Sequence, residues 1–151
     1  MRKMLVLIAL AALPTSLAAQ EDAYVELLRS DVKTQRVAII TEVMQFSDSA
    51  AAIFWPIYRE YEFESTQIGD DMLVLLKDYA ANYDALTADM AKDLANRSLK
   101  IQEDDLKLRR KYFKKVEKAM GSVTAARFLQ IENQINLLID LQIAQALPLI
   151  Q

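Results

Sequence analysis

Apolar residues recur at steps of three or four along most of this chain, which is the spacing of one face of an α-helix. The first run extends from Asp22 to about Met44, and its apolar side contains Val25, Leu28, Val32, Ile39, Val43 and Phe46. The apolar side of the second run, over residues 48–85, contains Phe54, Ile57, Tyr58, Tyr61, Ile68, Met72, Leu75, Leu76, Tyr79 and Tyr83. Pro56 removes a backbone donor inside this run, so we expect one helix kinked near residues 52–56 or two nearly coaxial helices.

The third run, up to Met120, is apolar over about half of its circumference, which is more surface than one neighbouring helix covers. Its apolar residues are Met90, Leu94, Leu99, Ile101, Leu106, Leu108, Tyr112, Phe113, Val116 and Met120. Asp105 and Arg109 lie within this arc, four residues apart, and are spaced to form an ion pair. A helix of about 33 residues is about 50 Å long, whereas a compact domain of this size has a radius of gyration of about 14 Å. We therefore expect the helix to overhang its own domain and to pack antiparallel against a second protomer in a twofold dimer.

The fourth run, residues 124–147, contains few charges, namely Arg127, Glu132 and Asp140. Its apolar residues cover most of the circumference: Phe128, Ile131, Ile135, Leu138, Ile139, Leu141, Ile143 and Leu147. A helix that is apolar nearly all round is normally buried. We predict that it is the central packing helix or part of a dimer interface, and that Pro148 ends it.

Hydroxyl side chains mark three of the expected helix starts. Ser47, Thr87 and Thr124 each follow an apolar residue and can accept hydrogen bonds from the free N–H groups of a first turn. Val123 and Phe128 have the spacing at which an apolar residue before the cap folds back onto the helix. Helices should begin near residues 21–23, 47–48, 87–88 and 122–124. With only two glycines and three prolines in 151 residues, the sequence predicts an all-α fold of four helices.

The first nineteen residues have the organisation of a secretory signal peptide. Arg2 and Lys3 precede an apolar run from Met4 to Leu13, and small residues follow up to a cleavage site near Ala18 or Ala19. The apolar run is about half as long as a membrane-spanning helix requires. The alternative is that this run forms the first turns of a buried helix. We expect residues 1–19 to be removed on export and residues 20–151 to form a single all-helical domain.

The absence of histidine and cysteine from the chain excludes several kinds of active site. These are Ser-His-Asp and Cys-His nucleophiles, histidine-rich zinc sites and the Glu-x-x-His sites of di-iron helical bundles. No nucleophile elbow or glycine-rich phosphate loop occurs either. The carboxylates of residues 60–64 and 103–105 suit Ca²⁺ or Mg²⁺, but no loop is present to hold such an ion. We expect no enzymatic activity, no cofactor and no metal site.

Positive charge is concentrated near the end of the third run. Without residues 1–19 the net charge is about −5, yet one short stretch contains Lys107, Arg109, Arg110, Lys111, Lys114, Lys115 and Lys118. One interpretation is a solvated face that is favoured near a helix C-terminus. The other is a surface that attracts acidic or disordered polypeptide, or weakly contacts an anionic membrane surface. We do not expect nucleic-acid binding, because the chain is acidic and contains no recognition motif.

The segments that follow Leu86 and Val123 resemble the Spy/CpxP-like family of periplasmic stress proteins, which have a Leu-Thr-x-x-Gln motif and are related to metal-resistance sensors. Residues 86–90 read Leu-Thr-Ala-Asp-Met, with Met90 in place of Gln. Residues 123–127 keep Thr but have Arg127 at that position, and residues 46–50 keep only a hydroxyl. The segment from Phe54 to Glu62 also resembles a recurrent signature of this group. The resemblance covers most of the chain in outline and implies a hooked helical hairpin with a long central helix, in an elongated antiparallel dimer in the periplasm.

What the resemblance implies about function is an ATP-independent holdase that binds unfolded polypeptides on a surface of mixed positive and apolar character. The expected client contacts are the seven basic residues above together with Leu106, Tyr112, Phe113 and Val116. The flexible side chains of Met72, Met90 and Met120 suit a promiscuous surface, although each also suits a core. The alternative is a regulatory adaptor or sensor protein of an envelope-stress or metal-resistance system. Binding to unfolded protein would favour the first function, and tight binding to one regulatory partner would favour the second.

Overall fold

The computed structural model describes residues 34–150, and every regular element in this range is helical. Residues 34–44 form a helical segment, followed by α2 (Asp48–Asn82), the short 3-10 helix η1 (Tyr83–Ala85), α3 (Ala88–Met120) and α4 (Ser122–Ala146). The prediction of an all-α fold is confirmed for these residues. The predicted signal peptide and the predicted helix start at 21–23 lie outside the described residues. The chain divides into two compact units, residues 1–38 and 39–151, and the second is described below.

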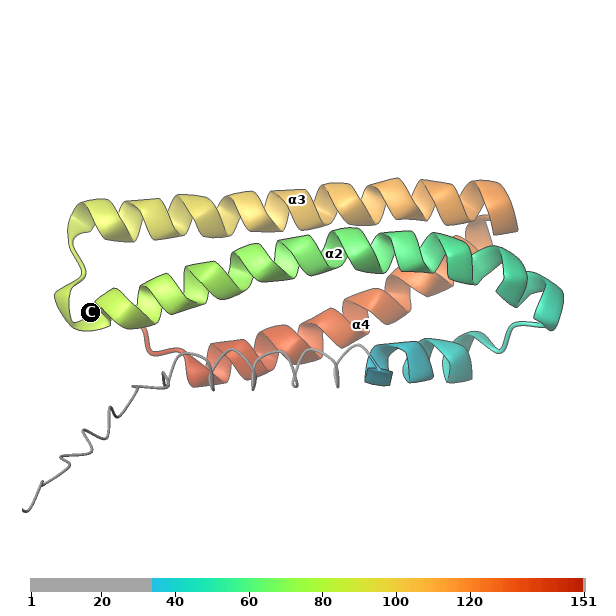
Figure 1. Cartoon of the computed structure of the whole chain (residues 1–151), viewed down its shortest axis with the longest axis horizontal. Coiled ribbons are helices and arrows are strands. Elements are labelled where there is room, and N and C mark those ends of the chain that lie inside the picture. The colour runs from blue at the N-terminus through green and yellow to red at the C-terminus, as the bar shows by residue number, and fades with distance from the viewer. Residues whose placement is uncertain (1–33, 151) are drawn as a thin grey trace, which may run out of the picture. The chain divides into compact units, whose positions relative to one another are not determined.

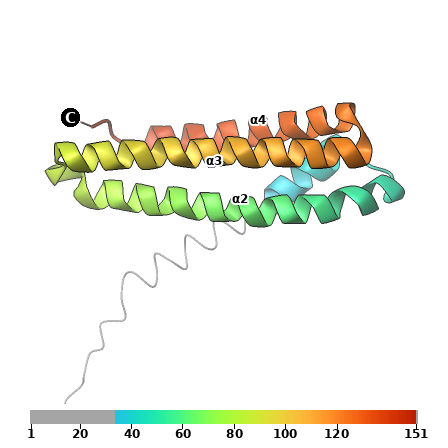
Figure 2. The same ribbon diagram turned by 90° about the horizontal axis from the view of Figure 1, so that it is seen from above.

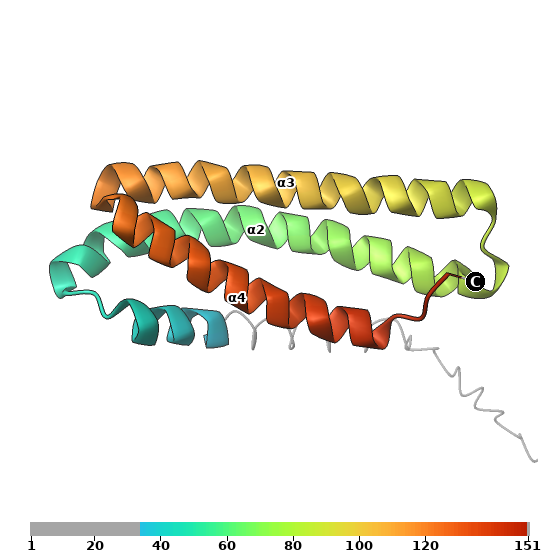
Figure 3. The ribbon, with the colours of Figure 1, turned by 180° about the vertical axis from the view of Figure 1, so that it is seen from behind.

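Helices α2 and α3 form a long antiparallel hairpin, and α4 runs back along it (Figures 1 and 2). Seen from behind, α4 starts where α3 ends and finishes near the junction of α2 and α3 (Figure 3). Residues 48–82 form one continuous helix that includes both Pro56 and Gly69. The ribbon of α2 arches over its first turns, which contain Pro56 (Figure 1).

An aromatic core joins the three helices. Phe128 of α4 lies at ring-centroid distances of 5.5 Å from Phe54, 6.2 Å from Tyr58 and 5.4 Å from Tyr61, all on α2. Tyr112 of α3 lies 5.3 Å from Tyr61 in a T-shaped pair. Such edge-to-face contacts are favourable beyond the burial of apolar area. The core is unevenly distributed, because Leu75 and Ile101 are the only buried residues between positions 62 and 104 of the described structure.

A buried polar contact lies within this aromatic core. Glu132 of α4 is 1% exposed, and its Oε2 accepts a hydrogen bond of 2.9 Å from the hydroxyl of Tyr61. A carboxylate is rarely buried without such partners, because burial removes its hydration. The contact therefore ties α4 to α2 at one position along their length.

Capping side chains start two of the helices. The Ser47 hydroxyl accepts a hydrogen bond from the Ala50 N–H at 3.4 Å, and the Thr87 hydroxyl accepts one from the Met90 N–H at 3.3 Å. The predicted cap at Thr124 is wrong: α4 already begins at Ser122, and Gly121 occupies its N-cap position without a side-chain hydrogen bond. Glycine alone adopts the backbone of residue 121 readily (φ 87°, ψ 161°), so the turn forms three residues earlier than the hydroxyl pattern indicates. Val123 is 85% exposed and does not fold back onto Phe128.

The segment before α2 buries a different face from the one predicted. Ile40 and Met44 are buried in the core, whereas Ile39 and Val43 are exposed. Both pairs are apolar and four residues apart, so the spacing alone could not distinguish them. The segment is held on α4 by a hydrogen bond of 2.6 Å from the Arg127 guanidinium to the Val43 carbonyl oxygen.

Helix α4 is less buried than its composition predicts. None of its buried residues lies beyond Ile135; they are Ala125, Phe128, Ile131, Glu132 and Ile135. Leu137, Leu138 and Leu141 are exposed. The prediction of burial nearly all round is therefore wrong for one copy of the chain, because the hairpin covers one side of α4 only.

Candidate functional site

Ion pairs divide the predicted basic cluster on α3 into two groups. Lys111 contacts Glu64 of α2 at 2.6 Å, and Lys115 pairs with Glu60 of the same helix. Lys107 pairs with Glu103 at 2.8 Å within α3. These three cations are partly neutralised by carboxylates, so each contributes less to a positive surface than its sequence position indicates.

The spaced pair predicted within α3, Asp105 and Arg109, is present as an ion pair. The Arg109 guanidinium also donates a hydrogen bond to the Asn133 side chain of α4. Arg109 therefore links two helices and is unavailable as a free cation. The ion pair itself lies within α3, and the hydrogen bond to Asn133 is the contact that reaches α4.

Tyr112 of α3 packs against α2. Its side chain is buried, and its hydroxyl donates a hydrogen bond of 2.8 Å to Glu64. The ammonium groups of Lys111 and Lys115 each lie 5.2 Å from the centroid of its ring, within the range of cation–π contacts. Burial, followed by the hydrogen bond to Glu64, raises the pKa of Tyr112 above its usual value. The phenol therefore stays protonated and serves as a structural donor.

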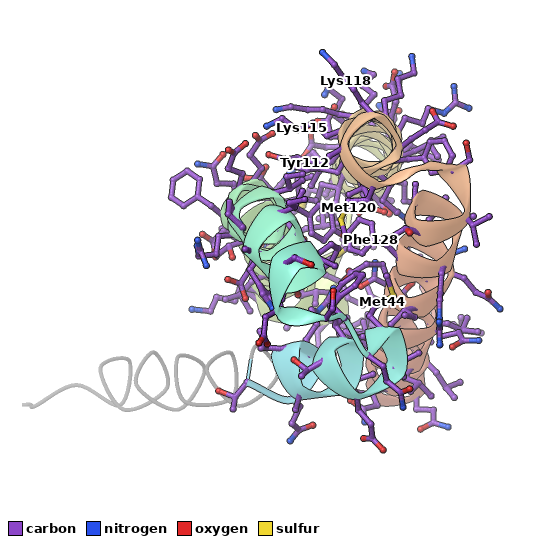
Figure 4. All side chains as sticks on the ribbon, turned by 90° about the vertical axis from the view of Figure 1, so that its right-hand side faces the viewer. Met44, Tyr112, Lys115, Lys118, Met120 and Phe128 are labelled. Atoms are coloured by element: carbon purple, nitrogen blue, oxygen red, sulfur yellow. The ribbon has the colours of Figure 1, made fainter. Side chains whose placement is uncertain are left out.

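Two of the four apolar residues predicted as client contacts lie in the core of the chain. Tyr112 and Val116 are buried, because their positions on α3 face the aromatic core. Leu106 is 49% exposed and Phe113 is half-buried, so both remain accessible. Figure 4 shows this division: Tyr112 points between the helices, and Lys118 points away from them.

The outward face of α3 carries the cations that remain. Arg110, Lys114 and Lys118 are exposed, follow one another at four-residue steps, and form no ion pair within residues 34–150. We call these three residues the basic stripe. Residues four apart are neighbours on a helix surface, so the three side chains form a continuous line of positive charge.

An apolar line runs beside the basic stripe. Leu99, Leu106 and Phe113 are spaced seven residues apart, and we call them the apolar seam. Arg110 lies four residues after Leu106 and three before Phe113, which makes it a neighbour of both. The candidate site is this combined surface of α3, on which the apolar seam and the basic stripe adjoin around Arg110.

An exposed aromatic residue on α2 was not among the sequence candidates. Phe63 is exposed, and with Pro56, Arg59, Glu60 and Glu64 it lines a surface depression. The sequence feature that could have identified it is that Phe63 lies outside the apolar face of its helix, where a side chain is expected to be exposed. Phe63 therefore adds an exposed apolar side chain on α2, the helix that packs beside α3.

The carboxylates considered for cation binding are largely occupied by basic side chains. Glu60 and Glu64 contact lysines of α3, while Asp104 contacts Lys100. Within residues 34–150, no group of three His, Cys, Asp or Glu side chains is arranged to hold a metal ion. The same range contains no helix with both the length and the apolar content of a membrane span.

The Glu64 contact predicts a small pH-dependent contribution to stability. Hydrogen bonds from Lys111 and then Tyr112 lower the pKa of Glu64, so the charged carboxylate stabilises the fold above its unfolded pKa of about 4.3. We expect Glu64→Gln to lower the free energy of unfolding at pH 7 by less than about 1 kcal/mol, because the pair is partly exposed to solvent. The difference should shrink progressively as the pH falls below about 4.3 and through the lower pKa of the folded state, beneath which both states bind the proton.

Urea unfolding at pH 7 and pH 3 measures this effect. Asp71→Asn is the matched control, since it removes the charge of an exposed α2 carboxylate that has no ion pair in the described structure. A Glu64→Gln difference that is the same at both pH values would contradict the assignment of the effect to the ionised carboxylate.

Comparison of the chain with family models, with curated proteins and with solved structures gave no match.

Proposed function

We propose that this protein is a periplasmic, ATP-independent holdase-type chaperone or stress-response protein that binds unfolded or partly folded polypeptides. The observation that supports this most is the adjacency of the apolar seam and the basic stripe on one face of α3. Unfolded chains present apolar side chains together with carboxylates. A surface that offers both kinds of contact side by side can hold many such segments weakly, without a defined pocket.

The charge of the chain fits this mode of binding. The protein as a whole is acidic, so the basic stripe is a local positive region on a molecule that otherwise repels acidic partners. Long-range attraction would bring acidic segments to α3, and contact with Leu99, Leu106 and Phe113 would retain them. The attraction weakens with salt, because exposed charges are screened beyond about 10 Å at 0.1 M ionic strength.

The proposal includes a homodimer built on the hooked hairpin that the family resemblance implies. The exposed leucines of α4, Leu137, Leu138 and Leu141, form an apolar surface against which a second copy would pack. A dimer built on α4 would leave the apolar seam and the basic stripe of α3 open to the client.

The first experiment is light scattering by a chemically unfolded, aggregating model protein, with and without this protein and in the absence of ATP. We expect suppression of aggregation at near-stoichiometric ratios, stronger at low than at moderate salt. No suppression at either salt concentration would overturn the proposed function.

Reversing the charge of the basic stripe tests which residues hold the client. We expect Arg110→Glu/Lys114→Glu/Lys118→Glu to weaken client capture roughly fivefold to tenfold at low salt, and much less at moderate salt. The fold should be unaffected, because these side chains are exposed and form no ion pair in the described structure. Fluorescence anisotropy of a labelled unfolded polypeptide measures the affinity.

A matched pair of single variants separates local charge from net charge. Lys114→Glu and Lys92→Glu change the net charge equally, and both residues are exposed on α3. Only Lys114 lies beside the other cations of the basic stripe, so Lys114→Glu should have the larger effect. Equal effects of the two variants would remove the basic stripe from the binding site.

The spacing of the apolar seam also favours a second candidate, a regulatory adaptor that binds one helical partner. Seven-residue spacing suits a partner helix better than an extended chain. A saturable one-to-one complex with a single folded envelope-stress protein, together with no suppression of aggregation, would support this alternative.

A further inference from the structure

The segment that follows α4 is docked on α2 by its backbone. Helix α4 ends at Ala146, and Leu147 is extended, with φ −92° and ψ 126°. Residues 147–150, which we call the strap, lie beside the C-terminal end of α2 (Figures 1 and 3). This position is at the opposite end of the hairpin from the α3–α4 turn and from Lys118.

Two tyrosine hydroxyls hold the strap. Tyr79 donates a hydrogen bond of 2.8 Å to the carbonyl oxygen of Pro148, and Tyr83 donates one of 3.2 Å to that of Leu149. The two rings form a T-shaped pair with centroids 5.6 Å apart. Burial, followed by the neighbouring Tyr83, raises the pKa of Tyr79, so its hydroxyl remains a donor through the neutral range.

The side chains of the strap contribute little to this docking. Leu149 is 87% exposed, and Ile150 is also exposed. Both tyrosine hydrogen bonds are accepted by backbone carbonyls of successive residues, and every residue of an extended peptide possesses such a carbonyl. Recognition through main-chain hydrogen bonds tolerates many sequences, as it does when a peptide is added to the edge of a sheet.

We propose that the Tyr79–Tyr83 pair is a docking site for an extended segment of another polypeptide, recognised through its backbone carbonyls, and that the strap occupies this site in the same chain until such a segment displaces it. Each of these two neutral surface hydrogen bonds replaces a hydrogen bond to water, so its net contribution is favourable but small and the strap is exchangeable. Its advantage is that it is tethered and therefore always present at high local concentration. This site is separate from the basic stripe and does not depend on the holdase function.

The test uses a fluorescent hexapeptide with the sequence of residues 146–151, Ala-Leu-Pro-Leu-Ile-Gln, added to the full chain and to a variant lacking residues 148–151. Removal of the strap should raise the apparent affinity about tenfold if the strap is docked about nine-tenths of the time. In the shortened variant, Tyr79→Phe/Tyr83→Phe should abolish binding, because it keeps both rings and removes both donors. Circular dichroism establishes that each variant remains helical.

Three results would overturn the proposal. They are equal affinity of the full and shortened chains, unchanged binding after the double tyrosine substitution, and loss of binding in a variant altered only at Lys114. The last result would place the peptide on the basic stripe instead. A scrambled hexapeptide of the same composition should bind nearly as well, whereas strict dependence on the native order would contradict recognition through the backbone.

Discussion

Phe128→Ala is expected to lower the free energy of unfolding by about 3–5 kcal/mol, the range for truncating a buried aromatic side chain. Phe128 is buried and contacts the rings of Phe54, Tyr58 and Tyr61. Alanine would remove the contacts by which α4 is joined to the aromatic side of α2, and a cavity would remain. Because small domains are marginally stable, this loss is a large fraction of the total. Urea denaturation followed by circular dichroism measures it.

Phe63→Ala is the matched control, because it is the same substitution at an exposed position of α2. Phe63→Ala should change the free energy of unfolding by no more than about 0.5 kcal/mol, as most surface substitutions do. Comparable losses in the two variants would mean that Phe63 is covered in solution, for example by a second copy of the chain. A small loss for Phe128→Ala would contradict the central position of its ring.

Gly121→Ala is expected to destabilise the protein by about 1–3 kcal/mol, although no atom beyond the adjacent residues lies within 4 Å of the position that a Cβ would occupy. The cost arises in the backbone, since residue 121 has a positive φ of 87° combined with an extended ψ of 161°. Side chains are strained in that conformation. The turn between α3 and α4 would have to change, and the two helices would lose part of their contact.

Gly69→Ala is expected to raise the free energy of unfolding instead of lowering it. Gly69 lies inside α2, and a Cβ there also meets nothing within 4 Å. Alanine in a helix interior is favoured over glycine by about 0.5–1 kcal/mol. Thermal and urea unfolding of the two variants in parallel tests both predictions, and destabilisation of similar size at the two sites would contradict the backbone argument.

Helix boundaries were the most predictable part of the fold, because they depend on neighbouring residues. Ser47 and Thr87 lie at the N-caps of α2 and α3, where the hydroxyl pattern placed them. The prediction of a cap at Thr124 was wrong because Gly121, three residues earlier, occupies the N-cap position. The preference for hydroxyl side chains at N-caps does not take the backbone conformation of glycine into account. Local rules therefore compete, and the sequence does not state which one prevails.

The candidate site was predictable only as a region of the chain. The cluster at residues 107–118 is evident in the sequence, but its division is not. Glu60 and Glu64, which neutralise Lys115 and Lys111, lie about fifty residues earlier and become neighbours only in the hairpin. Likewise, an apolar arc over half of a helix does not reveal that Tyr112 faces the core while Leu106 faces solvent. Which side of α3 is covered depends on where α2 and α4 pack.

The uneven core has a consequence for how the molecule unfolds locally. Most buried side chains lie near the α3–α4 turn, and the half of the hairpin next to η1 has Leu75 and Ile101 as its buried residues in the described structure. The free energy needed to open a segment depends on the apolar area that the opening exposes. The two ends of the hairpin therefore differ in the free energy of local unfolding. The η1 end, with the strap, can open and close again while the aromatic end stays folded. Local unfolding, short of global unfolding, is therefore concentrated at the η1 end, while the end near the α3–α4 turn keeps its packing.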